Sequence, residues 1–240
     1  MNELLLAGSL ILIYGTVLLA YRFFGKSGLF CMSAVATILA NIEVSVLVVA
    51  FGVEQTLGNV LFASTFLITD ILNECEGKKD ANRAVLISTC ASAFFLIISR
   101  SWLWYEPSGN DTVHSGMATV FTNTPRVITA SLSVYAISQF FDVWLYNRWW
   151  RFTEKHFGSK RKFLWFRNNA STMISQLVNT VLFTTFAFWG TYSTGTFISI
   201  CTSTYVIYLI LSLSDTPFIY LARRINDKKI QKETSKKIKP

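Results

Sequence analysis

Apolar runs as long as a membrane-spanning helix follow one another along the chain. A helix crosses the hydrocarbon core of a bilayer with about 20 mostly apolar residues, because each residue advances it by about 1.5 Å. Runs that meet or approach this length lie at 4–21, 29–51, 59–75, 84–104, 125–146, 168–190 and 197–221. The sequence therefore predicts an all-α fold, a polytopic transmembrane helix bundle of about seven spans.

The composition favours a membrane protein over a soluble one. Charged residues make up 15% of the chain and apolar residues 52%, whereas a soluble domain carries about 25% charged residues. The 240 residues suffice for one bundle and leave no room for a second sizeable domain. We expect a single transmembrane bundle over residues 1–225, followed by a basic, disordered cytoplasmic tail at 226–240.

Lysine and arginine are confined to every second connection between the runs. The segments 22–26, 78–83, 148–167 and 223–239 hold 20 of the 22 basic residues, and the alternate connections hold none. Basic connections stay on the cytoplasmic side of membrane proteins. We therefore expect the N-terminus outside, the C-terminus inside and a location in the cytoplasmic membrane. The net charge of +8 then reflects topology and contact of the tail with membrane lipid, with no nucleic-acid partner.

Polar side chains inside the second and third runs are candidates for function. A charge at the bilayer centre costs about 2.5–3.5 kcal/mol on insertion scales, so such groups usually face the bundle interior. Asn41 and Glu43 lie in the second run, and Asp70, Asn73 and Glu74 share one helix face in the third. The alternative for Glu74 is a position at the cytoplasmic interface beside the basic segment that follows.

The fifth and sixth runs carry further polar groups. Gln139 and Asp142 share a helix face, while Arg126 lies near the outer end of the same run, too far away to pair with Asp142. Arg126 must find a carboxylate elsewhere, extend outward or contact substrate. The sixth run carries one polar stripe, which either joins helices or lines a cavity: Asn169, Thr172, Gln176 and Asn179.

Motifs typical of enzymes and metal sites are absent from the sequence. The four cysteines are scattered without a Cys-x-x-Cys spacing, and His114 and His156 both lie in connections between runs. No base inside the membrane is available to activate a nucleophile. We therefore predict a protein that is not an enzyme and has no catalytic residue, metal or cofactor.

Several of these polar clusters resemble the signature of the queuosine precursor transporter family. The matching segments agree in order and spacing over roughly residues 35–222 and lie at 66–70, 73–74, 77–79 and 81, 126–131, 139–143, 167–169, 171–172 and 175–176. The resemblance implies bacterial uptake of a 7-deazaguanine precursor of the tRNA nucleoside queuosine. It also implies a six-helix core to which the first span is an addition.

Two positions depart from the family pattern. Several members have an acidic residue at Asn179 and a lysine at Ile207. Because the acidic residue and the lysine are both absent from this chain, neither charge is left without a partner, as expected when an ion pair is lost. The departure leaves open which derivative is carried, a precursor base with a nitrile or aminomethyl group or free queuine.

The sequence as a whole favours a transporter for a deazapurine. The ring would stack on aromatic residues such as Phe66, Phe140 or Phe183, and the carboxylate of Asp70 or Asp142 would accept from its N–H groups. Gln176 and Asn179 would meet the remaining polar edge. The alternative is a substrate-binding subunit of an energy-coupling importer for vitamins or nucleobases, which would co-purify with ATPases. The coupling ion and the oligomeric state, including a homo-oligomer, stay open.

Overall fold

The computed structural model describes residues 1–122, 125–158, 162–191 and 193–238. The predicted basic segment at 148–167 and the predicted tail at 226–240 also cover residues 159–161 and 239–240, which lie outside the described residues. The described residues form helices and one two-stranded sheet, in the order α1 (Asn2–Glu43), β1 (Leu47–Ala50), β2 (Val53–Thr56), α2 (Asn59–Cys75), α3 (Lys78–Trp102), α4 (His114–Phe121), α5 (Pro125–Phe157), α6 (Leu164–Phe188) and α7 (Thr194–Ile238).

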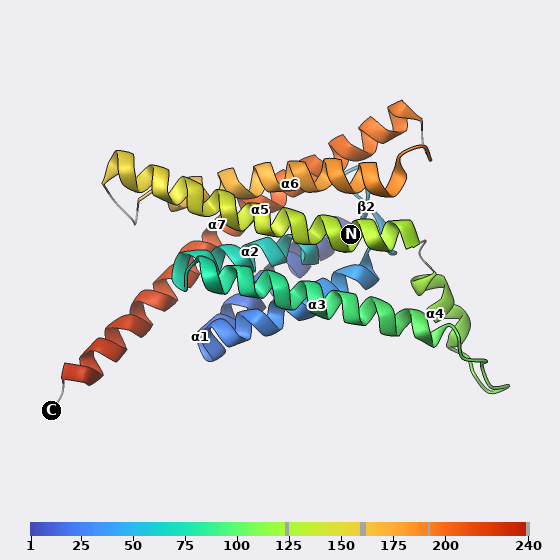
Figure 1. Cartoon of the computed structure of the whole chain (residues 1–240), viewed down its shortest axis with the longest axis horizontal. Coiled ribbons are helices and arrows are strands. Elements are labelled where there is room, and N and C mark those ends of the chain that lie inside the picture. Colours follow the sequence, from blue (N-terminus) through green and yellow to red (C-terminus); the bar gives the residue numbers. More distant parts are fainter. Residues whose placement is uncertain (123–124, 159–161, 192, 239–240) are drawn as a thin grey trace.

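Helix α1 is broken at Gly25 and returns on itself. Gly25 has φ 59° and ψ −144°, a conformation that glycine adopts more readily than other residues. The side chain of Asn2 donates to the carbonyl of Val49, and Glu3 accepts from the backbone N–H of Phe51. These bonds place the start of α1 beside the strand that follows its end. The two halves of α1 therefore form a helical hairpin (Figure 1) and correspond to the first two apolar runs.

The packing between the two halves of α1 can be tested at Gly28. A Cβ added there would collide with the backbone carbonyl oxygen of Ala20 in the opposite half. Gly28→Ala is therefore expected to lower the free energy of unfolding by about 1–3 kcal/mol, the usual range for overpacking. Gly15→Ala is the matched control, because a Cβ at Gly15 meets nothing within 4 Å. Thermal unfolding of the purified variants measures both, and equal stability of the two would contradict this packing.

The connection after α1 is a β-hairpin, which corrects the expected helix over 29–51. The helix ends at Glu43, and β1 pairs with β2 in an antiparallel register that joins Ala50 to Val53. Both turn residues, Phe51 and Gly52, have positive φ, as a two-residue hairpin turn requires. The segment was assigned to a helix because a short apolar run rich in valine does not distinguish strand from helix by periodicity.

A short helix, α4, was also missed by the sequence reading. It lies in the connection between α3 and α5, where the backbone N–H groups of His114 and Val113 donate to the side chain of Asp111 at 2.8 and 2.7 Å. These bonds stabilise the ionised carboxylate and lower the pKa of Asp111. Eight residues with no buried side chain are too few for a span, so the count of apolar runs could not reveal them.

Helix α2 is the central element of the bundle. It packs against α1, α3, α5 and α7, and 14 of its 17 residues are buried. Its bounds agree with the apolar run predicted at 59–75. Among the described residues, four helices are long and apolar enough to cross a membrane by length and composition, α1, α3, α5 and α7. Together these features confirm an all-α helical bundle and a multi-pass membrane protein.

The long helices extend beyond the apolar runs. α5 continues to Phe157, and α7 continues to Ile238, where a disordered tail was expected from residue 226. The apolar runs mark only the part of a helix inside hydrocarbon, and lysine, glutamine and glutamate in the extension are good helix formers. Helical structure from Asn226 to Ile238 therefore corrects the expected disorder of the tail.

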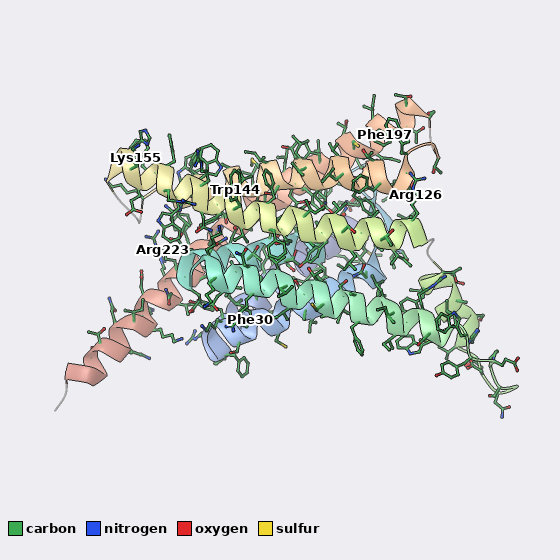
Figure 2. The ribbon with its side chains drawn as sticks, in the orientation of Figure 1. Phe30, Arg126, Trp144, Lys155, Phe197 and Arg223 are labelled. Atoms are coloured by element: carbon green, nitrogen blue, oxygen red, sulfur yellow. The ribbon has the colours of Figure 1, made fainter. Side chains whose placement is uncertain are left out.

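The two ends of the bundle differ in their connections. The α2–α3 and α5–α6 connections lie at one end, on the left of Figure 1, and α4 and the α6–α7 connection lie at the other. Figure 2 shows Lys155 and Arg223 at the first end and Arg126 and Phe197 at the opposite end. The connections that the sequence marks as basic thus gather at one end, the basic end.

Candidate functional site

A cavity of about 100 Å³ lies between the helices at the end that holds the β-hairpin. Thr56 at the end of β2 and Gly58 contribute to its wall. Its remaining lining comes from α1, α2, α3, α5, α6 and α7, so that six helices converge on it: Thr37, Ala40, Asn41, Val44, Asn59, Phe62, Ser92, Ser131, Leu132, Tyr135, Asn179, Phe183 and Tyr208. We call it the hairpin-side cavity.

One side of the hairpin-side cavity is aromatic. The ring of Phe62 lies 5.9 Å from that of Tyr135 and 5.6 Å from that of Tyr208, measured between centroids. Phe183 from α6 completes the aromatic lining. Aromatic side chains offer flat apolar faces on which a heterocyclic ring stacks, with little dependence on ring identity.

The other feature of this cavity is a set of asparagine side chains. Asn41 donates through Nδ2 to the carbonyl of Thr37 at 2.8 Å and to Oγ of Ser92 at 2.7 Å. Asn59 accepts through Oδ1 from the hydroxyls of Thr56 and Tyr208, each at 3.3 Å. Asn41 and Asn59 are therefore positioned by the protein, and among the described residues each retains one polar atom without a partner.

Asn179 differs from the other two asparagines. Its side chain is 7% exposed and lines the cavity, and among the described residues nothing hydrogen-bonds to it. A buried amide without partners is unfavourable by about 1–3 kcal/mol. Such a group in a cavity wall is typical of a site in which a ligand supplies the missing hydrogen bonds.

A layer of buried carboxylates lies deeper in the bundle. Asp70, Asp142 and Asp215, from α2, α5 and α7, are each at most 1% exposed, and Asp70 lies near the other two. Thr172 donates to Asp70 at 3.0 Å, and Asn168 donates to Asp215 at 2.6 Å. Ser171, Ser175 and Asp70 lie beside Asp142, but among the described residues no hydrogen bond to either of its oxygens meets the usual limits of distance and angle.

Helices α2 and α5 are joined by amide hydrogen bonds around this layer. Gln139 donates to Thr65 at 2.6 Å and accepts from Thr69 at 3.1 Å. Asn147 donates to Oδ1 of Asn73 at 2.8 Å. The predicted residues Gln139 and Asn73 therefore connect helices in this conformation.

Glu74 is the centre of an ion-pair cluster near the basic end. Its carboxylate accepts from Arg167 at 2.8 Å and from the hydroxyl of Tyr146 at 2.7 Å, and Arg223 lies 3.6 Å away. The Arg167 guanidinium also lies 4.7 Å from the ring centre of Trp150. These contacts tie α2 to α5, α6 and α7 and agree with the interfacial alternative considered for Glu74. We call them the Glu74 cluster.

The remaining candidates are outside the lining of the hairpin-side cavity. Arg126 donates to the carbonyls of Phe186 and Trp189 and so caps the end of α6. Asn169 donates to Thr216 and joins α6 to α7. Gln176 is buried, and its Oε1 has no hydrogen-bond partner in the part of the chain that the structure describes. Glu43 is the last residue of α1 and outside the cavity lining.

The structure thus separates the predicted residues into groups. Asn41 and Asn179 line the hairpin-side cavity with Phe183, whereas Asp70 and Asp142 meet in the enclosed carboxylate layer. Of the other predicted stacking partners, Phe66 is fully buried and Phe140 is 39% exposed.

Sequence reasoning missed the residues that share the cavity with Asn41 and Asn179. Asn59 stands at the first position of an apolar run and was treated as its boundary. The aromatic residues of the lining were counted as apolar content of their runs. The available signal was the presence of hydrogen-bonding or aromatic groups inside apolar runs, as at Asn59, Phe62, Tyr135 and Tyr208.

Comparison with known proteins places the chain in a family. The sequence profile of the family described as "Putative vitamin uptake transporter" matches residues 56–222. A Bacillus subtilis (strain 168) protein named "Probable queuosine precursor transporter" is 37% identical over 209 residues, which cover 87% of this chain and 89% of the relative. No solved structure matches the chain. The chain is therefore a multi-pass membrane transporter that belongs to the queuosine precursor transporter family.

Proposed function

We propose that the protein imports a 7-deazaguanine-type precursor of queuosine, or free queuine, across the cytoplasmic membrane for tRNA modification. The observation that carries the proposal is the hairpin-side cavity, in which aromatic faces and partly unsatisfied asparagine amides meet. A flat, neutral heterocycle with a mixed hydrogen-bonding edge is the ligand class that such a lining suits. The relative's name supports the same substrate class.

The proposed topology has seven spans. The two halves of α1 supply the first two, and α2, α3, α5, α6 and α7 supply the rest. α2 is short but lies in the interior of the bundle, where lipid contact is limited, and the polar residues of α6 lie on its buried face. The basic end faces the cytoplasm by the positive-inside rule, so the hairpin-side cavity faces outward.

In this arrangement the conformation described is one step of a transport cycle. The hairpin-side cavity receives the base from outside, and the Glu74 cluster holds the inner ends of α2, α5, α6 and α7 together. Release of the base into the cell then requires these inner contacts to separate. The carboxylate layer lies between the hairpin-side cavity and the Glu74 cluster, and the base passes it on its way into the cell.

An uptake assay tests the proposed function. In a bacterial strain unable to make queuosine precursors, expression of the intact protein with the precursor in the medium is expected to restore queuosine in tRNA. A strain that carries the empty vector is the control. Lack of restoration with a correctly inserted protein would refute the function, and restoration only together with co-purifying ATPases would indicate a binding subunit of a larger importer.

Phe62 provides a prediction within this assay. Its ring is central to the aromatic side of the cavity, and base–aromatic stacking contributes about 1–3 kcal/mol per base. Phe62→Ala is expected to raise the KM for uptake at least about tenfold. Phe94→Ala is the matched control, because Phe94 is 68% exposed on α3 and outside the cavity lining. A KM that is equal in the two variants would exclude stacking on Phe62.

A further inference from the structure

Two asparagines in the hairpin-side cavity are positioned by internal hydrogen bonds, and in Asn41 these bonds fix which way the amide faces. A carbonyl oxygen can only accept, so the bond from Asn41 to the carbonyl of Thr37 identifies the nitrogen of that amide. Ser92 takes the second Asn41 proton. Both donor protons of Asn41 are thereby used, and its Oδ1 is left as an acceptor in the cavity wall.

Asn59 has the opposite arrangement. Its Oδ1 accepts from the hydroxyls of Thr56 and Tyr208, and among the described residues its Nδ2 has no hydrogen-bond acceptor. Asn59 is 8% exposed and lines the same cavity as Asn41. The wall therefore presents one fixed acceptor from α1 and, in the orientation that Asn59 has in this structure, one donor from α2.

We propose that Asn41 and Asn59 form a donor–acceptor pair that selects a lactam edge, an N–H next to a carbonyl on a planar ring. The inference rests on the proposed function and specifies which atoms of the base are read. Asn41 Oδ1 accepts from the ring N–H, and Asn59 Nδ2 donates to the ring carbonyl. Asn179, whose amide is free to turn, adds affinity without fixing the polarity of the ligand.

A 6-amino ring reverses the order of donor and acceptor along this edge. It satisfies the same pair only when turned over, which carries its 7-substituent to the opposite wall of the cavity. A ligand that leaves buried polar groups of its site unpaired binds much more weakly than one that pairs with them. The pair therefore discriminates a 6-oxo from a 6-amino 7-deazapurine that bears the same 7-substituent.

Binding of this matched ligand pair to the purified full-length protein tests the inference. The wild type is expected to bind the 6-oxo compound at least about tenfold more tightly than the 6-amino compound. Asn59→Leu is expected to reduce the ratio of the two Kd values toward one. Asn179→Leu is the control in the same cavity and is expected to weaken both ligands while preserving the ratio.

A second variant tests how the pair is positioned. Ser92→Ala removes one of the two anchors of the Asn41 amide and is expected to lower the ratio of the two Kd values by about two- to fivefold. A ratio in Asn59→Leu equal to that of the wild type, or equal binding of both ligands to the wild type, would overturn the assignment. Binding of neither ligand to the wild type would refute the proposed function itself.

Discussion

Replacing Glu74 with alanine is expected to lower the free energy of unfolding by about 3–5 kcal/mol, the range measured when one partner of a buried ion pair is removed. Arg167 is fully buried and Glu74 is 3% exposed, so water cannot solvate the guanidinium that the substitution leaves behind. The hydroxyl of Tyr146 loses its acceptor at the same time. Thermal unfolding of the protein in lipid nanodiscs measures the effect.

Two further variants test whether the loss of stability in Glu74→Ala comes from the burial of its ion pair. The exposed pair between Lys26 and Asp80 has a similar distance, 3.0 Å, but Lys26 is 46% exposed. Asp80→Ala is therefore expected to lower stability by at most about 1 kcal/mol. The double variant Glu74→Ala with Arg167→Met should be more stable than Glu74→Ala alone, because no orphan charge remains. Equal losses in Glu74→Ala and Asp80→Ala would show that the Glu74 cluster is solvated rather than buried.

The stability of the Glu74 cluster bears on transport as well as on folding. In the proposed transport cycle, a cluster that joins α2 to α5, α6 and α7 at the basic end must be strong enough to keep that end closed while the hairpin-side cavity fills. It must also be able to separate when the base is released. Ionic and hydrogen-bonded contacts suit this role, because water that enters the opening gap can hydrogen-bond to the separated groups. Water offers no such compensation to apolar surfaces that separate.

The helical bundle could be predicted from the sequence because the bilayer imposes a length on every span. Hydrocarbon forces backbone polar groups to bond internally, which leaves helices as the structure of long apolar runs. This reasoning placed α2 at its observed bounds. It does not apply outside hydrocarbon, where the β-hairpin and α4 form and where α7 continues as a helix.

The candidate site could be predicted only in part. The sequence identifies polar groups that hydrocarbon cannot solvate, and Asn41, Asn179, Asp70 and Asp142 are all found in the bundle interior. Their grouping depends on how far along each helix a residue lies and on which helices are neighbours. Periodicity gives the face of one helix and contains no information on its neighbours. The separation of cavity from carboxylate layer therefore required the structure.

The carboxylate layer remains unexplained by structural roles alone. Among the described residues, no lysine or arginine forms an ion pair with Asp70, Asp142 or Asp215, and Arg167 is engaged by Glu74 instead. A buried carboxylate without a partner is strongly unfavourable. Residues that lower stability in this way are typical of functional sites, where activity rather than packing determines the side chain.

Asp142→Asn distinguishes a role in transport from a role in stability. The substitution is expected to reduce uptake of the precursor at least about tenfold while leaving thermal stability equal or higher. Stability does not fall, because the neighbouring hydroxyls of Ser171 and Ser175 donate to backbone carbonyls rather than to the carboxylate, and the buried charge is removed. Asp215→Leu is the control. The carboxylate of Asp215 accepts from Asn168 at 2.6 Å, and leucine leaves this buried amide donor unpaired, so we expect the free energy of unfolding to fall by about 1–3 kcal/mol. Normal uptake by a stable Asp142→Asn protein would remove the carboxylate layer from the transport path and confine substrate recognition to the hairpin-side cavity.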